Sequence, residues 1–271
     1  MKYTKLYTLL IILLFFWFNK LQAQATFIFK QYDLKEFGKY LPTISSDTIY
    51  YFDLDNTLIY FNDYSYGSDG WTDVIKDSIE QGSQSERERL KNTLYEILTP
   101  ANYSILPVFP VDTIYPRLLN AALDKKININ GLTSRGDTLD VITLQNLKNC
   151  GYKMNSIFYT KGGNKGLSIW ELFQKDQNNK NIVYVDDTLE KLKQAADSLY
   201  VKFRNTKDVT ITLIHLKNIN AKKYTVNCVT SYHEGLQFEN LNLCSGTNII
   251  SREEALIYWT SFKIFHSILN H

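Results

Sequence analysis

The stretch IYYFDLDNT, residues 49–57, decides the fold. Its first half is hydrophobic, which predicts a short buried strand over 47–53, and we take this strand as the first of a sheet. Its second half places two carboxylates, Asp53 and Asp55, on either side of a single leucine where the strand ends. Ligands bind at the carboxyl ends of parallel strands. We therefore expect a functional site directly after this strand.

Strand-like and helix-like segments alternate along the rest of the chain. Further strands are expected over 127–133, 156–160, 181–185 and 209–216, and helices over 112–125, 137–149, 165–174 and 188–199. This alternation predicts an α/β fold with a doubly wound, Rossmann-like parallel sheet. The core is assigned to 26–57 and 110–271, and its last part should hold an extended segment over 224–232 and a helix over 251–268.

The connection 58–109 is too long for an ordinary loop and needs structure of its own. We expect a small, mostly helical cap inserted after the first strand, with a helix over 85–98. The beginning of this cap is rich in aromatic residues, namely Tyr60, Phe61, Tyr64, Tyr66 and Trp71. These rings either stack on a flat leaving group or form the small core of the cap itself.

Residues 1–25 have the pattern of a secretory signal peptide. Lys2 and Lys5 precede an apolar run over 9–18, and the small residues Ala23 and Ala25 follow it. The run is about half as long as the roughly 20 apolar residues that span a membrane. We therefore expect cleavage after Ala23 or Ala25 and a periplasmic or secreted protein, with no stable membrane anchor after cleavage.

Composition and charge exclude several classes of protein. With 44% hydrophobic and 21% charged residues among 271, the chain can bury a sizeable core and is not a disordered protein. The formal charge of +2 is too small for a surface that binds a nucleic acid polymer. Three cysteines allow one disulfide at most, either Cys228 with Cys244 while Cys150 stays a buried thiol, or no disulfide at all.

Polar side chains follow four of the expected strands. Asp53 and Asp55 follow the first, Thr133 the second, Lys165 lies in the loop GGNKG after the third, and Asp186 with Asp187 follows the fourth. Carboxylates that share one edge of a sheet raise one another's pKa unless a cation is present, so this pattern indicates a divalent metal. Oxygen ligands without histidine favour Mg²⁺ over zinc, and few ligands favour it over calcium.

The remaining members of these clusters suit phosphate chemistry. A lysine and a hydroxyl provide a positive charge and a hydrogen-bond donor for phosphoryl oxygens, and an aspartate can attack phosphorus covalently. Lys161 competes with Lys165, and Ser134 with Thr133, for these positions. Arg135 and Asp137 are expected to be a solvated helix start and its cap rather than substrate contacts. The four histidines have no spacing typical of a metal site or a catalytic triad.

In the order and composition of these clusters, residues 49–189 resemble the haloacid dehalogenase-like (HAD) superfamily of phosphohydrolases. DLDNT, residues 53–57, matches the first motif of that family, and Thr133 in GLTSR matches the second. Lys165 matches the third motif, and Asp186 with Asp187 matches the acidic fourth. Together with the expected signal peptide, the pattern is similar to secreted bacterial acid phosphatases and to a group of exported HAD-like proteins.

The resemblance implies a role for each matching residue. Asp53 would attack phosphorus and form an aspartyl phosphate, and Asp55 would protonate the leaving oxygen and later activate water. Thr133 would bind a phosphoryl oxygen, and Lys165 would neutralise charge on Asp53 and on the phosphate. Magnesium would be held by Asp186, by Asp53 and by the backbone carbonyl of Asp55. Asp187 would be a further ligand or would orient one.

The sequence therefore predicts an exported, magnesium-dependent hydrolase, a phosphatase that cleaves a small phosphomonoester. Two alternatives remain open at this stage. One is a phosphotransferase or mutase that passes the phosphoryl group to a sugar. The other is a binding or surface-interaction protein that has kept a HAD fold without catalysis.

Overall fold

Six parallel strands form the central sheet of the computed structural model, which describes residues 25–61, 83–85, 87–88, 108–176, 180–217, 224–225 and 249–250. In spatial order they are β1 (Thr26–Asp33), β8 (Thr210–Lys217), β7 (Asn181–Asp186), β2 (Thr48–Phe52), β5 (Asn128–Thr133) and β6 (Ser156–Tyr159). Every neighbouring pair in this sheet is parallel. The predicted α/β, doubly wound fold is confirmed.

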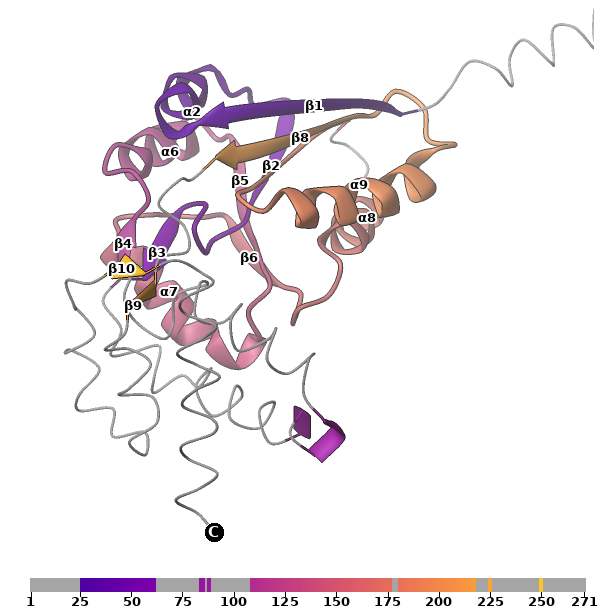
Figure 1. Ribbon diagram of the computed structural model, residues 1–271. Coiled ribbons are helices and arrows are strands. Elements are labelled where there is room, and N and C mark those ends of the chain that lie inside the picture. The colour runs from indigo at the N-terminus through magenta and orange to yellow at the C-terminus, as the bar shows by residue number, and fades with distance from the viewer. Residues whose placement is uncertain are drawn as a thin grey trace, which may run out of the picture.

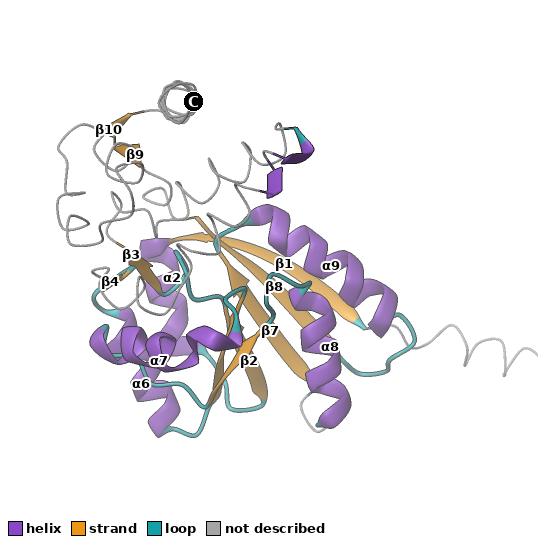
Figure 2. Cartoon of the chain, turned by 90° about the horizontal axis from the view of Figure 1, so that it is seen from below, coloured by secondary structure: helices purple, strands orange, loops and turns teal. Residues whose placement is uncertain are grey.

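Helices cover both faces of the sheet (Figure 2). One face carries α2 (Leu34–Tyr40), α6 (Tyr115–Asp124) and α7 (Asp140–Asn149), and the other carries α8 (Lys165–Lys175) and α9 (Leu189–Phe203). Successive side chains of a strand point to opposite faces. In β2, Tyr50 and Phe52 accordingly pack with the first group of helices, whereas Tyr51 packs with the second.

The order of the strands reverses at β2. The chain runs from β2 to β5 and β6 on one side, and then returns to β7 and β8 on the other side (Figure 1). In open α/β sheets, such a reversal opens a crevice at the carboxyl ends of the strands and is the usual place for a ligand. Asp53 and Asp186 lie at the carboxyl ends of β2 and β7, which are neighbours at this reversal.

The sheet begins one strand earlier than the sequence predicted. The strand β1 and the helix α2 precede β2, so the expectation that 47–53 is the first strand is wrong. β1 is an edge strand whose side chains are mostly exposed, and it therefore lacks the unbroken hydrophobic run of β2. A capping box between Asp33 and Glu36 starts α2 immediately after β1.

Two short strands bring the ends of the expected cap together. β3 (Ile59–Phe61) pairs antiparallel with β4 (Val108–Pro110), with Ile59 opposite Pro110. Most of the residues between these strands, including most of the expected helix over 85–98, lie outside the described part of the chain. The insertion after β2 thus starts from a two-stranded ribbon beside the sheet (Figure 1).

The remaining elements are small. Two 3-10 turns, η1 (Leu41–Thr43) and η2 (Asp137–Leu139), follow α2 and precede α7, and β9 (Tyr224–Thr225) pairs with β10 (Ile249–Ile250). Gly151 adopts a positive φ of 81° and ends α7, as predicted. Cys150 is a buried free thiol whose pKa is raised by burial to about 11.

Several expectations fall beyond the described part of the chain. They concern the expected signal peptide 1–25 except for its last residue, the pair Cys228 and Cys244, most of the segment 224–232, and the helix over 251–268. Among the residues that are described, none belongs to a helix with the length and apolar character needed to cross a membrane.

Gly166 allows α8 and α9 to pack closely, and α8 carries Lys165. A Cβ at Gly166 would overlap the backbone of Ala195 in α9, with its Cα at 2.8 Å. We expect Gly166→Ala to lower the free energy of unfolding by about 1–3 kcal/mol, because backbone atoms of α9 cannot rotate away as a side chain can. Urea denaturation followed by circular dichroism measures this change.

Gly136→Ala is the matched control for this variant. Gly136 has a φ of −77°, and its nearest neighbour for an added Cβ is a side-chain oxygen at 3.5 Å. The control should stay within about 0.5 kcal/mol of the unmodified protein. Equal stability of the two variants would contradict the close packing of α8 on α9.

Candidate functional site

A buried ammonium group joins two buried carboxylates at the carboxyl edge of the sheet. Lys165 Nζ lies 2.7 Å from Asp53 Oδ1 and 2.9 Å from Asp186 Oδ2. The side chain of Lys165 is 3% exposed, that of Asp53 12% and that of Asp186 1%. Buried charges of this kind are stable only when they are paired and hydrogen-bonded. The three residues therefore depend on one another.

Helix α8 brings Lys165 to this position. Asn164 caps the helix, and its side-chain oxygen accepts hydrogen bonds from the backbone N–H groups of Gly166 and Leu167. Its amide nitrogen donates to Gln194 O and Ser198 Oγ of α9, which fixes the start of α8 against that helix. The choice between Lys165 and Lys161 is thus decided by position: Lys161 is exposed and pairs with the exposed Asp137.

Asp186 is held from two more directions. The Tyr184 hydroxyl donates to Asp186 Oδ2, and the backbone N–H of Thr188 donates to Asp186 Oδ1 at 2.8 Å. Tyr184 and Asp186 are two residues apart on β7, so both side chains point to the same face of the sheet. Burial, followed by the charges of Asp186 and Asp53, raises the pKa of Tyr184 well above its ordinary value and keeps it a neutral donor.

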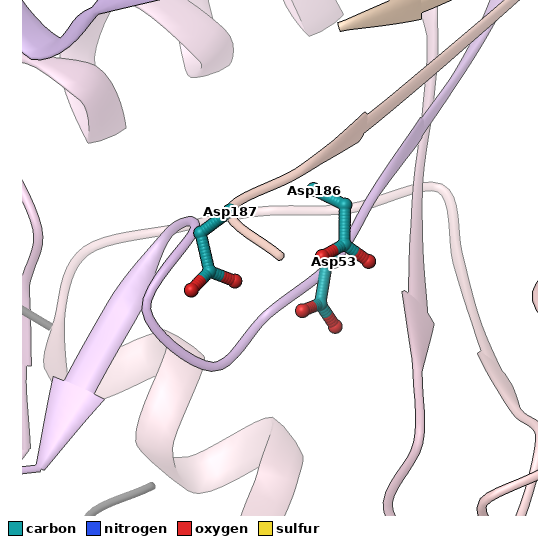
Figure 3. A group of neighbouring side chains, drawn as sticks. All are labelled: Asp53, Asp186 and Asp187. Carbon is teal, nitrogen blue, oxygen red and sulfur yellow. The ribbon is translucent and has the colours of Figure 1, made fainter. Parts of the chain in front are cut away.

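Asp187 completes a group of three carboxylates. One oxygen each of Asp53, Asp186 and Asp187 lies within 4.8 Å of the others (Figure 3). Thr57, the last residue of DLDNT, accepts a hydrogen bond from the backbone N–H of Asp187 and donates one to its carboxylate. His215 of β8 contacts the backbone carbonyl of Asp187 at 3.0 Å. Residues from the loop after β2, from β7 and from β8 therefore orient this group.

The charges of this group leave a deficit of positive charge. Three carboxylates against the single ammonium of Lys165 give a formal charge of −2 when all are ionised. The pKa of Asp53 is raised to about 8, chiefly by burial. The charge of Lys165 lowers this pKa, whereas the charges of Asp186 and Asp55 raise it further. Burial by itself would lower the pKa of Lys165, but the two carboxylates raise it above its ordinary value. A divalent cation would balance the group, and its oxygen ligands suit Mg²⁺.

Asp55 has a cation of its own. Arg135 Nε donates to Asp55 Oδ2 at 2.9 Å and Arg135 Nη2 to Asp55 Oδ1 at 2.6 Å, which is a bidentate ion pair. The side chain of Arg135 is 3% exposed, so the expectation that it is a solvated helix start is wrong. Asp137, in contrast, is exposed at the start of η2 as expected, but it does not cap a helix: Gly136 precedes η2, Leu139 precedes α7, and the Asp137 carboxylate pairs with Lys161.

Thr133 lies at the end of β5, beside the loop that contains Asp53. Gly131 pairs with Phe52 of β2, and Thr133 follows two residues later, where its side chain is fully buried. Its hydroxyl oxygen accepts a hydrogen bond from the backbone N–H of Arg135 at 3.2 Å. Ser134, its competitor, is half-buried. The structure thus brings Thr133 to the same edge as the predicted aspartates.

Sequence reasoning missed three residues whose side chains bond to the carboxylates of this site. Arg135 bonds to Asp55, Thr57 to Asp187 and Tyr184 to Asp186. Two of them had a usable signal, because Tyr184 shares a strand face with Asp186 and Thr57 belongs to the DLDNT stretch. Arg135 had only its position two residues after Thr133, because its partner Asp55 is 80 residues away along the chain.

The part of the chain that matches a known protein family contains only some of the residues of this site. Residues 30–157 match a family described as "Protein of unknown function (DUF2608)". This stretch includes Asp53, Asp55, Thr133 and Arg135, and it ends before Lys165 and before the aspartates at the end of β7. No curated protein matches the chain. The similarity therefore assigns no activity.

The raised pKa of Asp53 predicts a pH dependence of stability for the metal-free protein. Its carboxyl ionises near pH 4 in the unfolded chain and near pH 8 in the folded one, so the folded protein binds the extra proton. The free energy of unfolding in EDTA should fall between these values as the pH rises, by at most about 1.4 kcal/mol per pH unit. Urea titrations at several pH values measure this slope.

Asp53→Asn removes this titrating group and keeps its shape, so it should flatten the slope. Asp208→Asn is the control, because Asp208 is exposed and far from the site. It precedes the amino end of β8, whereas the site lies at the carboxyl ends of the strands. Asparagine also tolerates the positive φ of 56° at this position. An unchanged slope in Asp53→Asn would show that another group titrates.

Proposed function

We propose that this chain is an exported, magnesium-dependent phosphatase of the HAD type that hydrolyses a small phosphomonoester through an aspartyl phosphate. The observation that carries the proposal is the buried contact of Lys165 with Asp53 and Asp186, beside Asp187, at the carboxyl edge of a parallel sheet. These are the residues that the resemblance in sequence assigns to the site. Export rests on the sequence of residues 1–25.

The donor atoms suit magnesium. Asp53, Asp186 and Asp187 offer carboxylate oxygens close together, and their formal charge exceeds that of Lys165 by two. A bound Mg²⁺ would neutralise phosphate charge and favour the ionised form of the nucleophile. The carboxylate of Asp55 is paired with Arg135, so only the backbone carbonyl of Asp55 is proposed as a magnesium ligand.

The chain's own residues would then divide the reaction in two steps. In the first, the Asp53 carboxylate attacks phosphorus, the bond from phosphorus to the ester oxygen breaks, and Asp55, which enters this step as the protonated carboxylic acid, gives its proton to the departing oxygen. In the second, Asp55 takes a proton from a water molecule, which attacks the aspartyl phosphate and releases inorganic phosphate and a restored Asp53. Lys165 and Thr133 would hold the phosphoryl oxygens throughout.

The test is release of inorganic phosphate by the mature protein from aryl, nucleotide and sugar phosphates, with magnesium or with EDTA. Asp53→Asn should lower kcat by at least about a thousandfold, because the amide cannot form the covalent intermediate. Asp208→Asn, at the opposite edge of the sheet, should keep full activity. The activity of the unmodified protein should disappear in EDTA.

Trapping with beryllium fluoride separates the enzyme from a binding protein with the same fold. The unmodified protein should form a stable adduct on Asp53 in the presence of magnesium, and Asp53→Asn should form none. A folded protein that neither turns over any phosphate ester nor forms the adduct contradicts the proposal. Turnover that persists in Asp53→Asn contradicts the assigned nucleophile.

A further inference from the structure

The guanidinium of Arg135 holds Asp55 from its buried side. Two of its nitrogens donate to the two carboxylate oxygens, at 2.9 and 2.6 Å. The Arg135 side chain is 3% exposed, whereas that of Asp55 is 24% exposed. A carboxylate has about four lone-pair positions, of which this pairing uses two. The open side of Asp55 is therefore still able to exchange a proton with another molecule.

Arg135 is itself fixed by neighbours on three elements. Its Nη1 donates to Thr143 Oγ1 of α7 at 3.1 Å, and its guanidinium carbon lies 5.3 Å from the centre of the Phe61 ring of β3. Its backbone N–H donates to Thr133 Oγ1 at the end of β5. A planar cation held in this way can set the orientation of a carboxylate, which a flexible ammonium group cannot do.

We propose that Arg135 is a positioning residue that fixes the direction of the Asp55 carboxyl for proton transfer. This inference rests on the proposed phosphatase function, in which Asp55 protonates the leaving oxygen. Asp55 lies on the turn after β2, and the paired guanidinium limits rotation of its side chain. Proton transfer needs the donor within hydrogen-bond distance of the leaving oxygen, so loss of this orientation slows that transfer specifically.

The test uses substituted phenyl phosphates, which share one shape but differ in the acidity of the phenol that leaves. A good leaving group departs without a proton, whereas a poor one needs the acid. Arg135→Lys keeps the charge but loses the two-pronged contact. The loss of kcat/KM in this variant should therefore be about tenfold larger for phenyl phosphate than for p-nitrophenyl phosphate. A purely structural defect would lower both values by the same factor.

Thr143→Val provides a second variant that keeps the Arg135 side chain. It removes the hydroxyl that anchors Nη1 and nearly preserves volume, so it should show the same dependence on the leaving group with a smaller loss. If Arg135→Lys fails to fold by circular dichroism, the Thr143→Val result decides. The matched control Arg117→Lys changes an exposed arginine of α6 and should leave both substrates unaffected.

The outcomes separate this inference from the function on which it rests. Absence of turnover in the unmodified protein overturns the proposed function itself. Normal turnover in the unmodified protein, with an equal loss for all phenyl phosphates in Arg135→Lys or with no loss, overturns the role of Arg135 alone. A loss that grows as the leaving group becomes poorer supports both.

Discussion

The burial of Lys165 between Asp53 and Asp186 is the interaction on which the rest of the site depends. Removing these charges from water costs several kcal/mol for each ion, and only close pairing offsets that cost. Lys165 is also the first residue of α8, where the helix dipole disfavours a cation by about 0.3–1 kcal/mol. The two carboxylates outweigh that penalty. The cluster thus constrains three elements at once, since β2, β7 and α8 must end or begin at the same place.

Asp53 and Asp55 are separated by a single residue, yet they lie in different surroundings. Asp53 shares Lys165 with Asp186, whereas Asp55 is bound to Arg135 and is more exposed. A pair of carboxylates can act as nucleophile and acid only if their environments differ. The separation arises from strand geometry: Asp53 still receives a backbone contact from β7, as its N–H donates to Val185 O, and Asp55 lies beyond the strand in the turn stabilised by Asn56.

Sequence alone was sufficient where burial follows a local pattern. The strands β2 and β7 contain hydrophobic runs, β5 and β8 alternate apolar with polar residues, and a polar residue at the end of β2, β5 and β7 predicts an edge with a site. It was insufficient for β1, whose side chains are mostly exposed at the edge of the sheet. It also misjudged Arg135, because nothing near residue 135 indicates a carboxylate contributed by residue 55. Lys165 and Lys161 were separated only by the packing of α8.

The short segment from Asp53 to Phe61 links the chemistry to the insertion. It contains both aspartates, it contains Thr57, which orients Asp187, and it ends in β3, whose Phe61 packs against Arg135. The ribbon of β3 and β4 is therefore in contact with the cation that holds Asp55. An insertion that starts from this ribbon cannot shift Phe61 without disturbing that cation. The position of the Asp55 side chain is consequently coupled to the base of the insertion. Asp53 is held independently, by its backbone hydrogen bond to β7 and by Lys165.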